Sequence, residues 1–238
     1  MNDLTYRMLA KMLDAFLWGG DLLDDENIPK KGPAVFIANH IGSLGPIGAV
    51  CSIPLRLYPW IIADTIDPVI AAEYVRVDFV EKELHLPMPL SLWLSKVITK
   101  IAIPLLNAVG VIPVPHDYEG QCRTLDTSLQ LLLKQKCLLV FPEDPNQERD
   151  ERYNMCPFQK TVMRLGEMYY KASRQRLKFY PLVVHETRVV KVGEPVAYNP
   201  LNAPAKERLR LKNLLEDNLH KMYLEITMAQ HMGIPSLH

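Results

Sequence analysis

The sequence predicts an α/β fold in a single domain, with a mostly parallel central sheet flanked by helices. Over its 238 residues, short apolar runs alternate with longer helical stretches, which is typical of parallel strands joined by helical crossovers. The runs are continuously apolar, as expected of strands that are buried on both faces. Nineteen prolines against eleven glycines indicate many fixed turns and element ends.

An amphipathic helix is expected first, because residues 3–18 carry apolar side chains at helical spacing and Gly19 and Gly20 end the pattern. A long C-terminal helix, rich in Lys, Arg, Glu and Leu, is expected last. The single domain, residues 1–238, then consists of three parts: the N-terminal helix (1–20), the α/β core (33–200) and the C-terminal helix (203–230).

Apolar runs are expected to form the strands of the core. They are residues 34–38, 60–63, 111–114, 137–141 and 179–184. Helices are expected over residues 90–109, 123–136 and 159–175. In open parallel sheets, ligands bind beyond the carboxyl ends of the strands, where loops expose unpaired backbone amides. The candidate site is therefore expected at three strand exits: Asn39-His40, 114–117 and 141–144.

Two of these exits carry side chains that can take part in chemistry. His40 directly follows a buried strand, and a histidine held there can act as a general base because its unperturbed pKa lies near neutrality. The plainer alternative is a histidine that caps or packs a loop. Glu143 and Asp144 bring two adjacent carboxylates to another exit, where they can bind a cation, orient a base or solvate a turn.

The order and spacing of five segments resemble the glycerol-phosphate and lysophosphatidic acid acyltransferase family across most of the chain. In that family a strand leads to Asn-His-x-x-x-x-Asp, followed by Gly-x-Ile-Pro-Val-x-Arg, Phe-Pro-Glu-Gly-Thr-Arg-Ser, a Pro-Phe-Lys-Lys-Gly-like segment and a late strand that contains proline. The counterparts here are Asn39-His40, Gly110 to His116, Phe141-Pro142-Glu143, Pro157 to Lys160 and Tyr180 to Val184.

The resemblance implies an O-acyltransferase with His40 as its catalytic base. The histidine would remove a proton from a lipid or other hydroxyl acceptor, which then attacks the thioester of acyl-CoA or acyl carrier protein. No metal or bound organic cofactor is implied, because the thioester is a co-substrate. The resemblance assigns substrate binding to Asn39, Gly45, Gly110, Ile112, Val114, His116, Phe141, Pro142 and Glu143.

Three positions depart from the family pattern and indicate a degenerate active site. The motif aspartate falls on Gly45, and two arginines expected to bind phosphate fall on His116 and Asn146. An arginine offers phosphate a permanent planar fork of donors, which histidine matches only when protonated and asparagine without charge. A phosphorylated acceptor is therefore less favoured than in the family.

A substitute for the motif aspartate is expected at Glu143 or Asp144, which we predict to accept a hydrogen bond from the His40 ring. Ser43 is a weaker substitute, because an uncharged hydroxyl stabilises an imidazolium less well. Two other functions stay open: a non-catalytic relative that binds lipids, and a hydrolase of thioesters that needs only a base and an acyl pocket. No Gly-x-Ser-x-Gly nucleophile elbow supports a serine hydrolase.

Charge and cysteine usage indicate where the protein acts. Lys and Arg equal Asp and Glu at 27 each, which argues against a nucleic-acid partner. The four cysteines form no Cys-x-x-Cys pair, and no basic and apolar secretory signal precedes the first helix, so a cytoplasmic location is expected. Residues 90–109, with Trp93, Lys96 and Lys100 on an otherwise apolar helix, and residues 3–18 predict peripheral contact with the inner face of a membrane. The alternative is that both helices cover the sheet.

Overall fold

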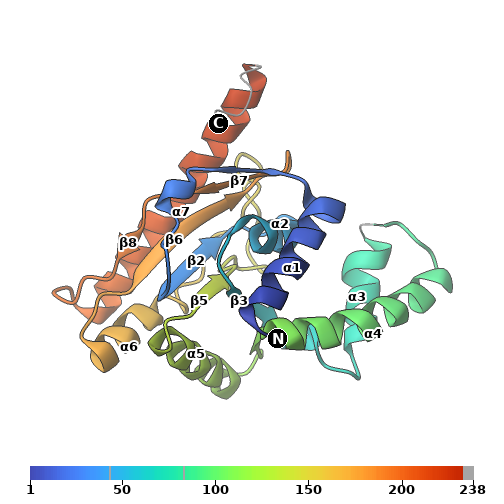
Figure 1. Cartoon of the computed structure of the whole chain (residues 1–238), viewed down its shortest axis with the longest axis horizontal. Coiled ribbons are helices and arrows are strands. Elements are labelled where there is room, and N and C mark those ends of the chain that lie inside the picture. The colour runs from blue at the N-terminus through green and yellow to red at the C-terminus, as the bar shows by residue number, and fades with distance from the viewer. Residues whose placement is uncertain (43, 83, 233–238) are drawn as a thin grey trace. The chain divides into compact units, whose positions relative to one another are not determined.

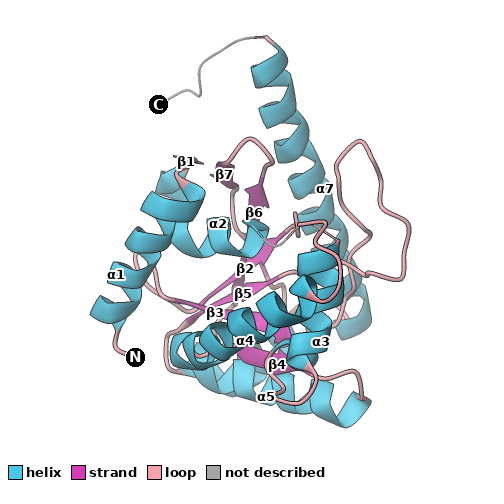
Figure 2. Ribbon diagram, turned by 90° about the vertical axis from the view of Figure 1, so that its right-hand side faces the viewer, coloured by secondary structure: helices cyan, strands magenta, loops and turns pink. Residues whose placement is uncertain are grey.

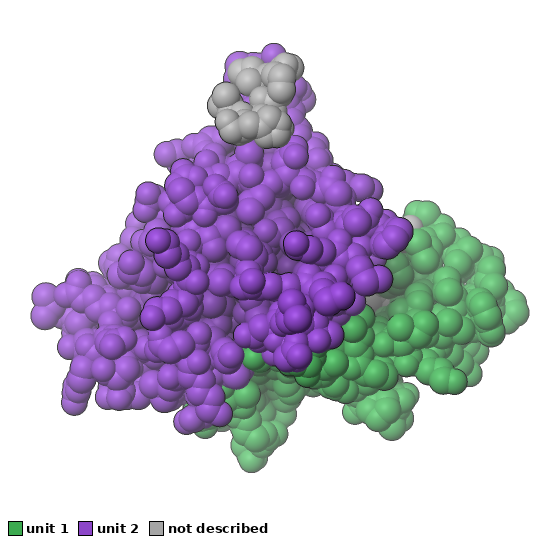
Figure 3. Space-filling view, in the orientation of Figure 1, with its two compact units in different colours: residues 1, 58–127 green, residues 2–57, 128–238 purple. Residues whose placement is uncertain are grey.

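The computed structural model describes residues 1–42, 44–82 and 84–232. It has the predicted α/β fold, in which a mostly parallel central sheet is flanked by helices (Figure 1). Within this fold the chain forms two compact units (Figure 3). The larger unit comprises residues 2–57 and 128–238, and the smaller one residue 1 and residues 58–127. The predicted strand exits at Asn39-His40 and 141–144 lie in the larger unit, and the exit at 114–117 lies in the smaller one.

The strand β2 (Ala34–Ala38) is central to the sheet of the larger unit. It pairs in parallel with β5 (Cys137–Val140) on one side and with β6 (Lys178–Val184) on the other. Every residue of β2 is fully buried, as its uninterrupted apolar sequence predicts. The remaining strands of this unit are β7 (Val189–Val192) and β8 (Val196–Ala197), both antiparallel to β6, and β1 (Asp21–Leu23), parallel to β7.

The pairing of β2 with β5 brings two of the predicted strand exits together. Ala34 lies opposite Cys137 and Ile37 opposite Val140, so the two strands run in register to their carboxyl ends. The chain after β2 and the chain after β5 therefore leave the sheet at the same edge. This edge carries Asn39-His40 and residues 141–144.

Helices cover the sheet of the larger unit (Figure 2). The helix α2 (Leu44–Ser52) contributes Ala49 and Ile53, just after its end, to a core cluster with strand residues such as Phe36. The long helix α7 (Pro204–His231) contacts β6 and buries one apolar stripe. That stripe consists of Leu211, Leu215, Leu219, Met222 and Ile226. Its spacing of three and four residues is that of an amphipathic helix with one face on the core.

The predicted N-terminal helix is α1 (Asp3–Leu13), which continues as the π-helical turn η1 (Asp14–Trp18). Asn2 caps its start, because the side-chain oxygen accepts a hydrogen bond of 2.8 Å from the Thr5 backbone N–H. Gly19 ends it with φ of 57°, a left-handed conformation that favours glycine. The 3-10 turn η2 (Asp25–Asn27) then leads toward β2.

The smaller unit contains the parallel strands β3 (Leu57–Ile62), which begins at the last residue of the larger unit, and β4 (Ile112–Val114). Trp60 lies opposite Ile112, so both strands end at the same edge. A group of helices accompanies them: η3 (Ala63–Thr65), α3 (Ala71–Val75), the π-helical η4 (Arg76–Glu81) and α4 (Leu90–Val109). The helix α5 (Tyr118–Leu133) starts in this unit and ends in the larger one.

The helix α4 buries small polar side chains and exposes large apolar ones. Ser91, Ser95 and Thr99 are almost fully buried on the face that contacts α3 and η4. The outward side chains are Leu90, Trp93, Val97 and Ile101, each more than a third exposed. Among the described residues, α4 is also the one helix long and apolar enough to cross a bilayer, judged by length and composition only.

The structure differs from the sequence prediction at several element boundaries. The helix predicted over 159–175 is α6 (Arg164–Ser173), which starts later. The reason is that the Gln159 N–H donates to the Pro142 carbonyl at 2.7 Å, and the Asp144 N–H to the Pro157 carbonyl at 2.9 Å. Residues 157–159 are thereby held in an extended pairing with the chain that leaves β5.

Candidate active site

Asn39 and His40, at the exit of β2, point in different directions. Asn39 is fully buried, and its side-chain amide exchanges two hydrogen bonds with the backbone of Val184, donating at 2.9 Å and accepting at 2.8 Å. This amide continues the pairing of β2 with β6 past the last strand residue. His40 is exposed, and its ring meets that of Phe141 edge to face at 5.3 Å between centroids.

Glu143 fixes the backbone of His40. One carboxylate oxygen, Oε1, accepts a hydrogen bond of 2.6 Å from the His40 backbone N–H, and Oε2 accepts one of 2.8 Å from the Cys156 backbone N–H. The side chain is only 6% exposed. Burial raises the pKa of Glu143, although the two amide hydrogen bonds and the nearby Arg149 charge oppose this rise. One carboxylate thus joins three segments of the larger unit.

The predicted substitutes for the motif aspartate lie in different surroundings. Glu143 accepts its hydrogen bond from the backbone amide of His40. That Glu143 also accepts one from the His40 ring stays a prediction. The side-chain Oδ1 of Asp144 accepts hydrogen bonds from the backbone and side-chain amides of Asn146, at 3.1 and 3.2 Å, and closes its own turn. Ser43 lies outside the described residues.

Gly45, where the resemblance predicts the motif aspartate to fall, is buried in the first turn of α2. A Cβ atom built on it would lie 3.6 Å from the Ile41 Cβ and 3.9 Å from the His40 carbonyl carbon. Both distances are ordinary van der Waals contacts. The backbone therefore leaves room for a side chain next to His40, although the sequence supplies none.

Arg149 is a residue of this edge that the sequence reasoning missed. Both of its terminal nitrogens lie 3.4 Å from the His40 carbonyl oxygen, and Nη2 is also 3.4 Å from Oε2 of Glu143. The Arg149 side chain is 41% exposed, so solvent reaches it. It brings a permanent charge to the backbone of His40 from the loop that also carries Asn146. The sequence signal that could have identified Arg149 is its position, three residues after Asn146 on the same loop.

The second predicted strand exit belongs to the smaller unit. Gly110 ends α4 with φ of 92°, and β4 follows with Ile112 buried and Val114 half-buried. Beyond the strand, the exposed His116 ring places Nε2 3.3 Å from the Asp64 carboxylate, which follows β3. The parallel pairing of β3 and β4 explains this contact, because both strands end at one edge.

Within the part of the chain that the structure describes, no group of three or more His, Cys, Asp or Glu side chains is arranged to hold a metal ion. The four cysteines are free thiols. Burial raises the pKa of Cys51 to about 12 and that of Cys137 to about 11, so both are protonated and unreactive at neutral pH.

The buried charge of Glu143 predicts a specific pH dependence. Because the folded-state pKa of Glu143 is raised, folding favours its protonated form. The stability that this side chain contributes is therefore full below the ordinary pKa of 4.5 and is lost as the pH rises through the raised pKa. Glu143→Gln stays neutral throughout. We therefore expect the free energy of unfolding of Glu143→Gln to increase relative to wild type as the pH is raised from below 4.5 to neutrality.

Urea denaturation of both proteins across this pH range measures the difference. Glu148→Gln, which removes an exposed carboxylate from the same loop, is the matched control. A difference between wild type and Glu143→Gln that stays constant with pH would contradict the burial of a charged carboxylate at this edge.

Comparisons with known proteins identify a similar fold. No family model and no curated protein matches the chain. Among solved structures, the chain is similar to the crystal structure of the 1-acyl-sn-glycerophosphate (LPA) acyltransferase PlsC from Thermotoga maritima, with a TM-score of 0.58 and 15% sequence identity. The similarity covers 94% of this chain and 79% of that one. The chain therefore has the fold of a glycerophosphate acyltransferase.

Proposed function

We propose that the protein is an acyltransferase that moves an acyl group from a thioester donor to a hydroxyl acceptor, with His40 as general base. The observation that carries this proposal is the position of His40. It is exposed at the carboxyl edge of the sheet, and Glu143 and Arg149 contact its backbone N–H and carbonyl. The similarity of the fold to an LPA acyltransferase supports the reaction class.

The proposed reaction needs one base and no covalent intermediate on the protein. A ring nitrogen of His40 takes the proton of the acceptor hydroxyl while the oxygen attacks the thioester carbonyl. The C–S bond then breaks, and the thiolate of the donor takes the proton from the imidazolium, which returns the histidine to its neutral form. Acyl-CoA and acyl carrier protein both fit this donor role. General-base catalysis of this kind is typically worth about 10²- to 10⁴-fold in rate.

We propose that the acceptor site is less suited to an anionic, phosphorylated acceptor than the site of the family resembled. Asn146, on the loop after β5 of the larger unit, carries no charge where the resemblance expects an arginine. Arg149 is a permanent cation on the loop after β5, and its guanidinium is already engaged with His40 and Glu143. A lipid or other hydroxyl acceptor therefore fits this edge better than the family's phosphorylated acceptor does.

Removal of His40 tests the proposed base. Thiol release from a panel of acyl-CoAs is measured with and without a lipid acceptor mixture. We expect acceptor-dependent release in wild type and a loss of about 10²- to 10⁴-fold in His40→Ala. His231→Ala, which removes an exposed histidine at the end of α7, is the control and should keep full activity. Equal release by wild type and His40→Ala would contradict the proposal.

The same assay separates the two other functions that the sequence left open. A non-catalytic lipid-binding relative, favoured by Gly45 and Asn146, releases no thiol from acyl-CoA or acyl carrier protein donors. A thioester hydrolase releases thiol at the same rate with and without acceptor. Only acyl transfer gives release that depends on the acceptor and yields an acylated product.

Gly45 offers a gain-of-function test, because an aspartate there restores the family's pair of His and Asp. The backbone has room for the side chain, and an acidic residue suits the first turn of a helix. We expect Gly45→Asp to raise kcat by at least about tenfold by orienting the His40 ring. Gly45→Asn is the uncharged control of equal size. An equal gain in a His40→Ala background would contradict a role for the histidine.

We also propose that the protein contacts the inner face of a membrane through α4. The outward stripe of Leu90, Trp93, Val97 and Ile101 supports this, since large apolar side chains on water-facing helices are costly. Lys96 and Lys100 are exposed on the same helix and suit anionic headgroups.

The N-terminal helix independently supports contact with a membrane. Its side chains at every fourth position are exposed: Leu4 by 70%, Met8 by 61%, Met12 by 57% and Phe16 by 81%. Arg7 and Lys11 are exposed beside this stripe, while Tyr6 and Ala10 are buried on the inner face. An apolar stripe bordered by basic residues is typical of helices that lie in the membrane interface.

Charge reversal on α4 tests the membrane contact. Co-sedimentation with vesicles of phosphatidylcholine and phosphatidylglycerol is measured for wild type and for Lys96→Glu/Lys100→Glu. Each basic residue near an anionic surface contributes about 1 kcal/mol, so we expect binding to fall by at least about tenfold. Lys206→Glu/Lys221→Glu, on the exposed face of α7, is the charge-matched control. Unchanged sedimentation of the α4 variant would count against this surface.

A further inference from the structure

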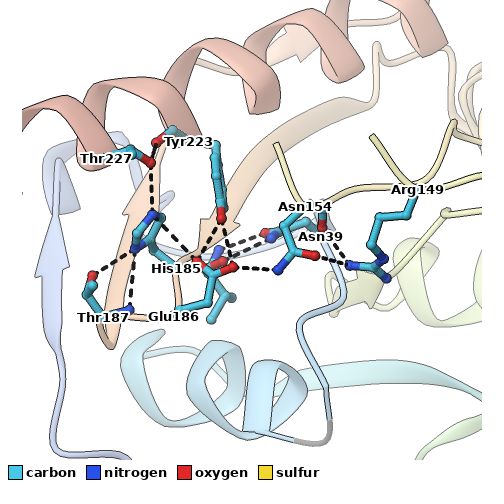
Figure 4. Close-up of polar contacts among 9 residues, drawn as sticks. Asn39, Arg149, Asn154, His185, Glu186, Thr187, Tyr223 and Thr227 are labelled. Carbon is cyan, nitrogen blue, oxygen red and sulfur yellow. Dashed lines mark hydrogen bonds and ion pairs between the residues drawn. The ribbon is translucent and has the colours of Figure 1, made fainter. Parts of the chain in front are cut away.

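A chain of polar contacts runs from the C-terminal helix to Arg149 (Figure 4), which in turn reaches the backbone of His40. On α7, the Tyr223 hydroxyl lies 2.7 Å from both carboxylate oxygens of Glu186. The side-chain N–H₂ of Asn154 donates to the same carboxylate. Nη1 of Arg149 donates to the backbone and side-chain oxygens of Asn154 at 2.6 and 2.9 Å, and reaches the His40 carbonyl at 3.4 Å.

The direction of these hydrogen bonds gives each member of the chain one orientation. Because the nitrogen of the Asn154 amide faces Glu186, its oxygen must face Arg149. Asn154 adopts a left-handed backbone conformation with φ of 49°, which asparagine tolerates better than most residues. Without the carboxylate of Glu186, Arg149 alone would orient this amide. The backbone oxygen of Asn154 would then be the more firmly held of the two Asn154 acceptors of Arg149.

Glu186 is itself held by its surroundings at the turn after β6. Burial opposes its charged form, but hydrogen bonds from Tyr223 and Asn154 outweigh this effect, so its pKa is lowered and it stays ionised. Burial and the Glu186 charge raise the pKa of Tyr223, which stays a donor. Both partners therefore keep their roles across the neutral pH range.

The neighbouring His185 is a structural residue of the same turn. The Thr187 N–H donates to its Nδ1 at 3.3 Å, so Nε2 carries the proton and donates to the Thr227 hydroxyl at 3.1 Å. The hydroxyl of Thr227 in turn donates to the Tyr223 carbonyl at 3.0 Å. Burial lowers the pKa of His185, in agreement with a neutral ring. His185 ties the turn to α7 and is saturated, so it is not a second base.

We infer that Arg149, Asn154 and Glu186 are positioning residues for His40. Glu143 contacts the N–H of His40 and Arg149 its carbonyl, so the peptide groups on both sides of its Cα are restrained. The direction of the ring depends on these two planes. This inference rests on the proposed function, in which His40 is the base. The contacts of Arg149 with His40 are long and partly exposed, so each one contributes modestly.

The test compares three variants of the full chain. Glu186→Ala removes the acceptor, Glu186→Gln keeps an acceptor oxygen without the charge, and Tyr223→Phe removes one donor. Tyr169→Phe is the matched control, because this buried tyrosine of α6 has its hydroxyl 3.5 Å from Gln175, outside the chain of contacts. Two experiments are made on each variant. Steady-state kinetics gives kcat and KM for acyl transfer from acyl-CoA to the lipid acceptor, and NMR gives the rate of hydrogen exchange of the His40 amide.

For Glu186→Ala we expect kcat to fall about three- to tenfold with KM nearly unchanged, because a misplaced base slows chemistry more than binding. Glu186→Gln should restore most of the loss, and Tyr223→Phe should give a smaller loss. Exchange of the His40 amide should accelerate in Glu186→Ala relative to amides of β2 such as Phe36. Tyr169→Phe should change none of these quantities.

The inference is overturned if Glu186→Ala leaves exchange of the His40 amide unchanged, or if exchange rises equally at Phe36, which is the signature of general destabilisation. It is also overturned if an active wild-type protein keeps its kcat in Glu186→Ala. If the wild-type protein transfers no acyl group, the proposed function fails, while the exchange measurement still decides whether the contacts restrain His40. The two failures are thereby distinguished.

Discussion

The hydrogen bonds accepted by Glu143 are the interaction on which the candidate site depends. β2 and β5 are parallel neighbours in register, so the two chains that leave them run side by side and bring backbone amides together. The buried carboxylate accepts hydrogen bonds from the amides of His40 and Cys156. The amide of the buried Cys156 would otherwise cost about 1–3 kcal/mol as an unpaired donor. Arg149 and the extended pairing of residues 157–159 then close around this carboxylate.

Much of the fold could be predicted from the sequence because its main elements are long or continuously apolar. The strand 34–38 and the helix 90–109 were predicted with the boundaries that the structure has. Short elements were missed, since β1, with three residues and an aspartate, carries no apolar periodicity. The helix α2 was missed because Gly45, Pro46 and Gly48 have low helix propensity and are typical of loops.

The site was predictable only as far as parallel topology determines it. That rule brought the exits of β2 and β5 together, as expected. The rule could not predict the contacts of Arg149, Asn154 and Glu186, because these contacts depend on loops far apart in sequence. For α4, periodicity indicated an amphipathic helix but not which face turns outward. Small residues such as Ser91 and Thr99 allow a close approach to α3 and η4, and this packing leaves the large apolar side chains outside.

The central claim is that the His40 ring, held at this edge, is the base of an acyl transfer. The most direct test compares two pH titrations: that of the His40 ring, followed by NMR with His40→Ala to assign its signal, and that of kcat/KM for acceptor-dependent transfer. If His40 is the base, activity rises with pH at the same midpoint at which the His40 ring loses its proton. A rate whose pH dependence follows another group, with a midpoint clearly separate from that of His40, would contradict it.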